Sequence, residues 1–151
     1  MIYGWSLGPQ ADTKIALKSL DMTIETFENM VISYEGMILH QDQGSVFTGS
    51  RWIEELLLKN KIRLSYTENG ARDNPEMESF NSHFTLCQYG ECPNKSLFLE
   101  ADDLTELKEI IKERVVYWNE KRRHSILDTK RPMEYVKERR GLKIDEFKTT
   151  V

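Results

Sequence analysis

Two acidic side chains with 35 residues between them are the part of this sequence that could do chemistry. Asp42 lies in a polar segment after a short apolar run, and Glu78 lies where a helix is expected to begin. Carboxylate oxygens are the ligands that Mg²⁺ prefers, and paired divalent ions stabilise the attacking and leaving oxygens of a phosphoryl transfer. The pair therefore predicts a metal site for phosphoryl-transfer chemistry.

Each candidate residue also has an ordinary explanation when it is taken alone. An aspartate in a polar loop is most often a turn residue, and a lone glutamate on a helix is most often exposed. His40 could orient a metal ligand, or it could be a hydrogen-bonded buried histidine. Asn74 could position DNA, or it could cap the helix that carries Glu78. Only the combination of Asp42 and Glu78 favours a metal site.

The elements before Glu78 must bring Asp42 close to it. An apolar segment, 1–7, predicts a strand, and Asp12 or Thr13 can cap the helix that follows. A short apolar run, 37–40, predicts a strand buried on both faces, as in a parallel sheet. A helix over 50–60 and an alternating strand over 62–66 complete a β-α-β-α-β order, which favours an α/β fold. The apolar stripes expected to face the core are Leu17, Leu20, Ile24, Phe27 and Val31 in one helix, and Trp52, Ile53, Leu56 and Leu57 in the other.

The elements after that point are predicted to be helical. A helix starts near Asp73, with Pro75 in its first turn, where a missing N–H does no harm. Met77, Phe80 and Phe84 are expected on its inner face. A long amphipathic helix is predicted over 102–121 and a short one from Pro132, with a tail over 141–151.

The charge balance is uneven along the 151-residue chain. The net charge is −4, yet the segment 121–140 carries eight basic against three acidic residues. An acidic first part beside a basic segment is compatible with a metal site next to a DNA-contacting surface. An ordinary solvated basic helix explains the same pattern.

Composition excludes several other classes of protein. No apolar run approaches the roughly 18 residues of a membrane span, and no signal peptide is apparent, so a cytoplasmic protein with no membrane partner is expected. Two cysteines, Cys87 and Cys92, are too few for a structural zinc site and are predicted to be reduced thiols.

Four stretches in order resemble the integrase catalytic core family, which comprises insertion-sequence transposases related to retroviral integrases. They are Tyr3-Gly4-Trp5-Ser6-Leu7, His40-Gln41-Asp42-Gln43-Gly44-Ser45, Asp73-Asn74-Pro75-Glu76-Met77-Glu78-Ser79-Phe80, and Tyr117-Trp118-Asn119-Glu120-Lys121-Arg122-Arg123-His124-Ser125 with Pro132 following. The resemblance covers roughly residues 3–137.

This resemblance implies an RNase H-like fold and a two-metal Asp-Asp-Glu site that uses Mg²⁺ or Mn²⁺ to cut and join bacterial transposon DNA. Asp42 would be the second acidic residue of that site and Glu78 the third, with His40 orienting a ligand. The DNA contacts implied by the same resemblance, or suggested by the local charge, are Asn74, Ser79, Lys121, Arg122, Arg123 and His124.

One part of the family pattern has no match in this chain. The family's first catalytic aspartate lies on its first strand, upstream of the stretch that contains Gly4. Asp12 is better explained as a helix cap, and Asp21 lies in the middle of a helix. The chain is therefore expected to be a catalytic core over 1–140 without its first two strands. Unpaired strand edges promote association, so self-association or a completing transposase chain is expected.

Three functions remain open at this point. The chain is part of a DNA transposase, or it is an inactive remnant that only binds DNA or a transposase subunit. An RNase H-like nuclease is a third reading, and the Arg122-to-Pro132 segment, which belongs to the transposase pattern, disfavours it.

Overall fold

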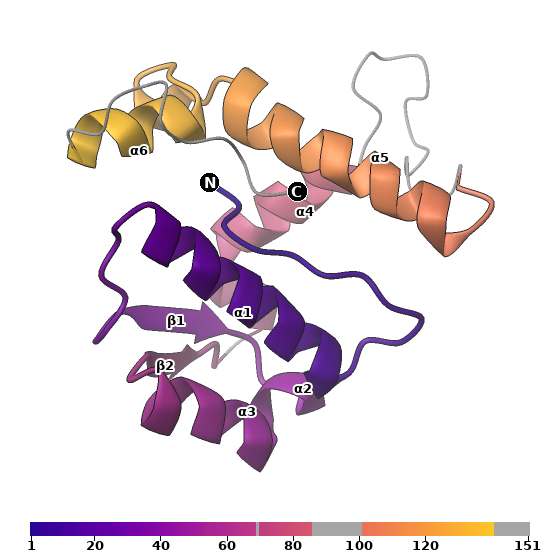
Figure 1. The fold of residues 1–151 in the computed structure, drawn as a ribbon, viewed down its shortest axis with the longest axis vertical. Helices are drawn as coiled ribbons and strands as arrows, with labels where there is room; N and C mark the ends of the chain where they lie inside the picture. The colour runs from indigo at the N-terminus through magenta and orange to yellow at the C-terminus, as the bar shows by residue number, and fades with distance from the viewer. Residues whose placement is uncertain (69, 86–100, 141–151) are drawn as a thin grey trace. The chain divides into compact units, whose positions relative to one another are not determined.

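The computed structural model describes residues 1–68, 70–85 and 101–140, which form two compact units. The first unit is Gly4–His83, and the second combines Met1–Tyr3 with the chain from Phe84 onward. Cys87, Cys92 and the predicted tail over 141–151 lie outside the described residues. Figure 1 labels the elements of both units.

Helix α1, Thr13–Asn29, opens the regular structure of the first unit and confirms the predicted cap. The Asp12 carboxylate accepts a hydrogen bond of 2.8 Å from the Ile15 N–H. Val31 was expected on the inner stripe, and this is wrong. It lies beyond the helix with φ at 53° and is 81% exposed, because the chain leaves the helical path at Met30. The buried side chains of α1 are Leu17, Leu20, Thr26 and Phe27.

Two short parallel strands form the sheet of this unit. Strand β1 is Ile38–Gln41 and β2 is Arg63–Tyr66, with Ile38 opposite Arg63 and Gln41 opposite Tyr66. The parallel pairing agrees with the prediction. The prediction that this first strand is buried on both faces is wrong, since Ile38 is 56% exposed. In the described part of the chain β1 has only β2 as a neighbour, so its other edge meets no strand.

The connection between the two strands is mostly helical. It consists of α2, Ser45–Thr48, then α3, Ser50–Glu54, which continues as a wider π-helical turn, Glu55–Lys59. Leu57, expected to face inward, is 42% exposed, because the buried stripe of this short helix is narrow. The buried core of this unit consists of Leu17, Leu20, Trp52, Leu56 and Ile62.

Helix α4, Pro75–Thr85, carries Glu78 and begins two residues after the predicted start near Asp73. The backbone carbonyl of Asn74 accepts hydrogen bonds from the N–H groups of Met77 and Glu78. Asp73 precedes this position, and its carboxylate accepts from the Glu68 N–H at 2.8 Å. Met77 is 48% exposed, so its expected place on an inner face is wrong. Its side chain lines a pocket and is not part of the buried core.

The N-terminal segment, 1–7, contains no strand, contrary to the prediction. A strand exists only when its backbone pairs with a neighbour, and no neighbouring strand pairs with this segment among the described residues. Gly4 instead lies directly against α1. A methyl group at Gly4 would stand 2.3 Å from the Ser19 carbonyl oxygen and 2.6 Å from the Thr23 nitrogen.

The second unit is built from two helices and the turn between them. Helix α5, Leu104–Val116, is capped by Asp103 and continues as a second π-helical turn, Tyr117–Lys121. A 3₁₀ turn, Ser125–Leu127, leads to α6, Pro132–Arg140. The predictions of a long helix and of a last helix from Pro132 are confirmed. The buried apolar side chains here are Val115, Trp118 and Met133.

A buried side-chain amide holds the start of the chain within this second unit. Asn119 is fully buried, and its Oδ1 accepts from the Ile2 N–H at 2.8 Å while its Nδ2 donates to the Ile2 carbonyl at 2.8 Å. The amide therefore satisfies both backbone groups of Ile2, as a neighbouring strand would. Within the described ranges, no helix has the length and apolar character to cross a membrane.

We predict that Gly4→Ala destabilises the chain by about 1–3 kcal/mol, because the added methyl group meets backbone atoms that cannot move without shifting α1. Urea denaturation followed by circular dichroism measures the difference. Gly49→Ala is the matched control, since the nearest atoms to a methyl group there lie at an ordinary 3.8 Å. Equal stability of the two variants would contradict the close approach of Gly4 to α1.

We predict that Asn119→Ala lowers the free energy of unfolding by about 2–4 kcal/mol, because two hydrogen bonds are lost and both Ile2 groups stay without partners. The control is Lys108→Ala, an exposed position on α5. Asn119→Asp, which keeps the acceptor and loses the donor, should also be less stable than the parent chain. A loss for Asn119→Ala no larger than for the control would show that the Ile2 contact contributes nothing.

Candidate metal centre and basic turn

The two predicted carboxylates line one pocket of the first unit, with a volume of about 560 Å³. Asp42 enters it from the end of β1, and Glu78 enters it from the first turns of α4. His40 and Asn74 line the same pocket, so four of the predicted site residues lie together. The other lining residues are Gly4, Ser19, Leu39, Gln41, Phe47, Trp52, Thr67, Met77 and Asn81.

The Asp42 carboxylate is oriented by the loop that follows it. Its Oδ1 accepts a hydrogen bond of 2.8 Å from the Gly44 N–H. This contact holds one oxygen toward the loop while the exposed carboxylate keeps its other oxygen for a ligand. A methyl group at Gly44 would stand 2.9 Å from Oδ1, so the absence of a side chain there keeps the contact possible.

Glu78 is exposed on the first turns of α4. A negative side chain in the first turn of a helix is stabilised by the free N–H groups and the helix dipole. The described part of the chain offers it no cationic side chain as an ion-pair partner, so its charge remains available. Asn74 immediately precedes the helix and adds an amide to the same pocket.

His40 is exposed, which differs from the buried histidine that was one of its two explanations. Its Nδ1 lies 2.9 Å from the Ser65 hydroxyl on β2. This hydrogen bond fixes the ring at the pocket edge and leaves Nε2 as the nitrogen available to a ligand or to water.

The strand end that carries Asp42 is held by a residue that sequence reasoning did not single out. Gln41 is buried, and its Oε1 accepts from the Trp52 indole N–H at 3.0 Å. Its Nε2 donates to the Phe47 carbonyl at 3.1 Å, and its backbone carbonyl accepts from the Thr67 N–H at 3.0 Å. All of these contacts fix the backbone position directly before Asp42. The only sequence signal was a polar residue between an apolar run and a candidate ligand.

The donor set fits a hard divalent cation such as Mg²⁺, which takes one or two protein carboxylates and completes its shell with water and phosphate oxygens. The described residues contain no group of three or more histidine, cysteine, aspartate or glutamate side chains placed to share an ion. Asp42 and Glu78 are therefore the acidic contribution of this part of the chain to the pocket.

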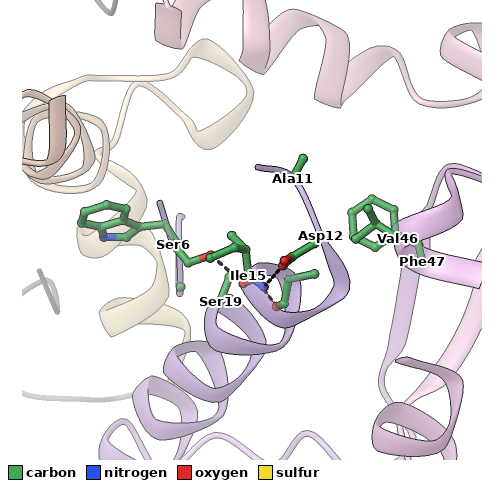
Figure 2. A pocket seen from close by; sticks show the side chains of 10 residues that line it. Ser6, Ala11, Asp12, Ile15, Ser19, Val46 and Phe47 are labelled. Atoms are coloured by element: carbon green, nitrogen blue, oxygen red, sulfur yellow. Dashed lines mark hydrogen bonds between the residues drawn. The ribbon is translucent and has the colours of Figure 1, made fainter. Parts of the chain in front are cut away.

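A second pocket of the first unit, of about 380 Å³, shows why Asp12 does not replace the unmatched aspartate. Figure 2 shows its carboxylate directed at the start of α1, where it accepts from the Ile15 N–H. The Ser6 hydroxyl donates to the Ile15 carbonyl at 2.6 Å across the same pocket (Figure 2). Asp12 serves as a helix cap, as predicted.

The predicted basic residues belong to the second unit. The Arg122 guanidinium lies 4.5 Å from the centroid of the Trp118 ring, and the His124 ring packs edge-on at 4.9 Å from the same centroid. Arg123 donates from Nη1 to the Thr129 carbonyl at 3.0 Å. Lys121 is exposed at the end of the π-helical turn. Ser79, the remaining predicted DNA contact, is exposed on α4 and is not among the residues that line the carboxylate pocket.

Comparison with known proteins finds a similarity to a transposase. The chain is 36% identical over 102 residues to the transposase for insertion sequence element IS904 of Lactococcus lactis. The matched region covers 68% of this chain and 38% of that transposase, so the chain corresponds to a little over a third of the relative's length. No protein-family model matches the chain, and no solved structure gives a significant match.

We predict that Trp52→Phe destabilises the chain by about 1–3 kcal/mol, because the buried Gln41 oxygen loses its donor while the aromatic core is kept. Gln41→Met should remove the same interaction from the other side. A double-mutant cycle by urea denaturation tests this, and the double variant should lose less than the sum of the single losses. Strict additivity would show that the two side chains do not interact.

Proposed function

We propose that this chain is part of a DNA transposase and contributes two carboxylates to the metal site that cleaves and joins DNA strands. The observation that carries the proposal is the convergence of Asp42 and Glu78 on one pocket, from a strand end and a helix start. The similarity to the IS904 transposase supports the transposase part of the proposal.

Asp42 and Glu78 would hold the metal, Mg²⁺ or Mn²⁺, through their carboxylate oxygens, one directly after β1 and the other on α4. Bound divalent ions stabilise the negative charge on the attacking and leaving oxygens of a phosphodiester. The Gly44 N–H keeps Asp42 oriented, and the Gln41 contacts keep the strand end in place. His40 and Asn74 present neutral polar groups at the pocket edge, which suit contacts with the ligand shell or with a DNA phosphate.

An RNase H-like fold is part of the same proposal. The parallel pairing of β1 with β2 supports it, as does the helical crossover between them. The helix α1 before β1 and the helix α4 after β2 agree with the order that the resemblance implies. The element order thus places Asp42 directly after β1 and Glu78 on α4, the helix that follows β2.

The basic residues of the second unit suit DNA as a partner. Lys121, Arg122 and Arg123 form no ion pair with any carboxylate in the described part of the chain. Such cations neutralise backbone phosphates and release counterions on binding, which makes the affinity depend on salt.

A second candidate function is a DNA-binding chain without catalytic activity of its own. The absence of a third acidic ligand beside Asp42 and Glu78 among the described residues favours it. Metal-dependent nicking of supercoiled DNA that Asp42→Asn and Glu78→Gln abolish would identify an enzyme. Salt-sensitive DNA binding that survives both substitutions, without nicking, would identify the binding chain.

We predict that the chain binds Mn²⁺ in calorimetric titrations, and that Asp42→Asn and Glu78→Gln each weaken the affinity at least about tenfold by removing one of two charged ligands. Glu76→Gln is the matched control, because Glu76 lies on the same exposed turn of α4 and does not line the pocket. Its affinity should equal that of the parent chain. The same weakening in all three variants, or no Mn²⁺ binding at all, would refute the metal site.

A further inference from the structure

The segment between α5 and α6 forms a closed turn stabilised by its own backbone. The His124 N–H donates to the Lys130 carbonyl at 3.1 Å, and the N–H groups of Leu127 and Thr129 both donate to the His124 carbonyl at 3.0 Å. Asp128 and Thr129 adopt left-handed backbone conformations, with φ values of 54° and 60°. These contacts and conformations close the chain into a narrow loop whose shape is set before any partner binds.

The base of this turn is held by side chains. His124 packs against Trp118, which is buried in the second unit, and the Arg122 guanidinium lies over the face of the same ring. Arg123 reaches across the base to the Thr129 carbonyl at 3.0 Å. The turn is therefore fixed to the end of α5 and does not hang freely from it.

Ile126 lies in the 3₁₀ part of the turn and is 86% exposed, the most exposed large apolar side chain among the described residues. The next residue, Leu127, is half-buried. Leu58 in the first unit is also well exposed, at 76%, but its cationic neighbour Lys59 is paired with Glu55. The cations that precede Ile126 form no ion pair with a carboxylate of the described residues.

The charges around the turn are unequal. The segment 120–131 contains five basic and two acidic residues, the acidic ones being Glu120 and Asp128. Lys130 pairs with Glu138, and Arg131 pairs with Glu134 at 3.0 Å, so the far side of the turn is largely neutralised. The Arg131 hydrogen bond lowers the pKa of Glu134 and keeps this carboxylate ionised. The residues just before the turn, Lys121, Arg122 and Arg123, form no ion pair within the described residues, although Arg123 lies close enough to Glu134 to help lower its pKa.

We propose that Ile126 is a wedge that inserts between neighbouring base pairs when the adjacent cations bind the DNA backbone. Proteins that kink duplex DNA combine phosphate-binding cations with an apolar side chain that separates a base step. Unstacking a base step costs free energy. A rigid turn suits this role, because a wedge that is already held in place adds little further entropy cost on binding. The inference rests on the proposed DNA partner and adds a distortion of the duplex that a purely electrostatic contact does not produce.

The test uses the whole chain and short duplexes that contain the fluorescent base 2-aminopurine at successive steps, together with anisotropy to measure affinity. We expect 2-aminopurine fluorescence to rise on binding of the parent chain, and Ile126→Ser to abolish most of that rise while weakening affinity about fivefold. Ile126→Met, which keeps an apolar side chain, should retain the rise. Leu58→Ser is the matched control, and its DNA affinity and fluorescence rise should equal those of the parent chain.

Each contrary outcome has its own meaning. Failure of the parent chain to bind DNA in low salt overturns the DNA partner and this inference together. Binding with no fluorescence rise, or a rise that Ile126→Ser leaves unchanged, overturns the wedge alone. A fall in self-association on Ile126→Ser, seen by sedimentation with the fluorescence rise unchanged, would assign Ile126 to a contact between copies of the chain and also overturn the wedge.

Discussion

The side-chain amide of Gln41 is the contact on which the candidate site depends most. Its oxygen is bonded to the Trp52 indole and its nitrogen to the Phe47 carbonyl, so one side chain ties the end of β1 to the crossover that leads to β2. A buried amide without partners would destabilise the fold, whereas a fully bonded one specifies a single arrangement. The position of Asp42 follows from it, because the aspartate is the next residue along the chain.

Buried side-chain amides hold the backbone at two places in this molecule. Gln41 links the end of β1 to Phe47 and Trp52 of the crossover, and Asn119 bonds both backbone groups of Ile2. A side-chain amide presents an N–H donor beside a carbonyl acceptor, so it can bond the N–H and the carbonyl of one backbone residue, as Asn119 does at Ile2. Gln41 and Asn119 lie in stretches whose charged members are the candidate site residues, and both amides are more buried than those charged side chains.

Much of the local structure could be predicted from the sequence, because periodicity and capping are local properties. Examples are the cap at Asp12 and the helix that carries Glu78 from Pro75 onward, and Asp42 and Glu78 line one pocket as expected. The errors concern properties set by neighbours. An apolar segment such as 1–7 becomes a strand only beside a partner, and Ile38 is buried only if a further layer covers it. Hydrogen bonds between residues far apart in sequence leave no periodic signal.

The two π-helical turns, Glu55–Lys59 and Tyr117–Lys121, bear on how the chain tolerates changes of length. A π turn corresponds to an α-helix that has taken up one extra residue, so losing one residue there restores ordinary α geometry. The same deletion elsewhere in a helix rotates everything beyond it by about 100°. These two helix ends are therefore the places where related chains can gain or lose a residue while the buried faces of α3 and α5 keep their phase.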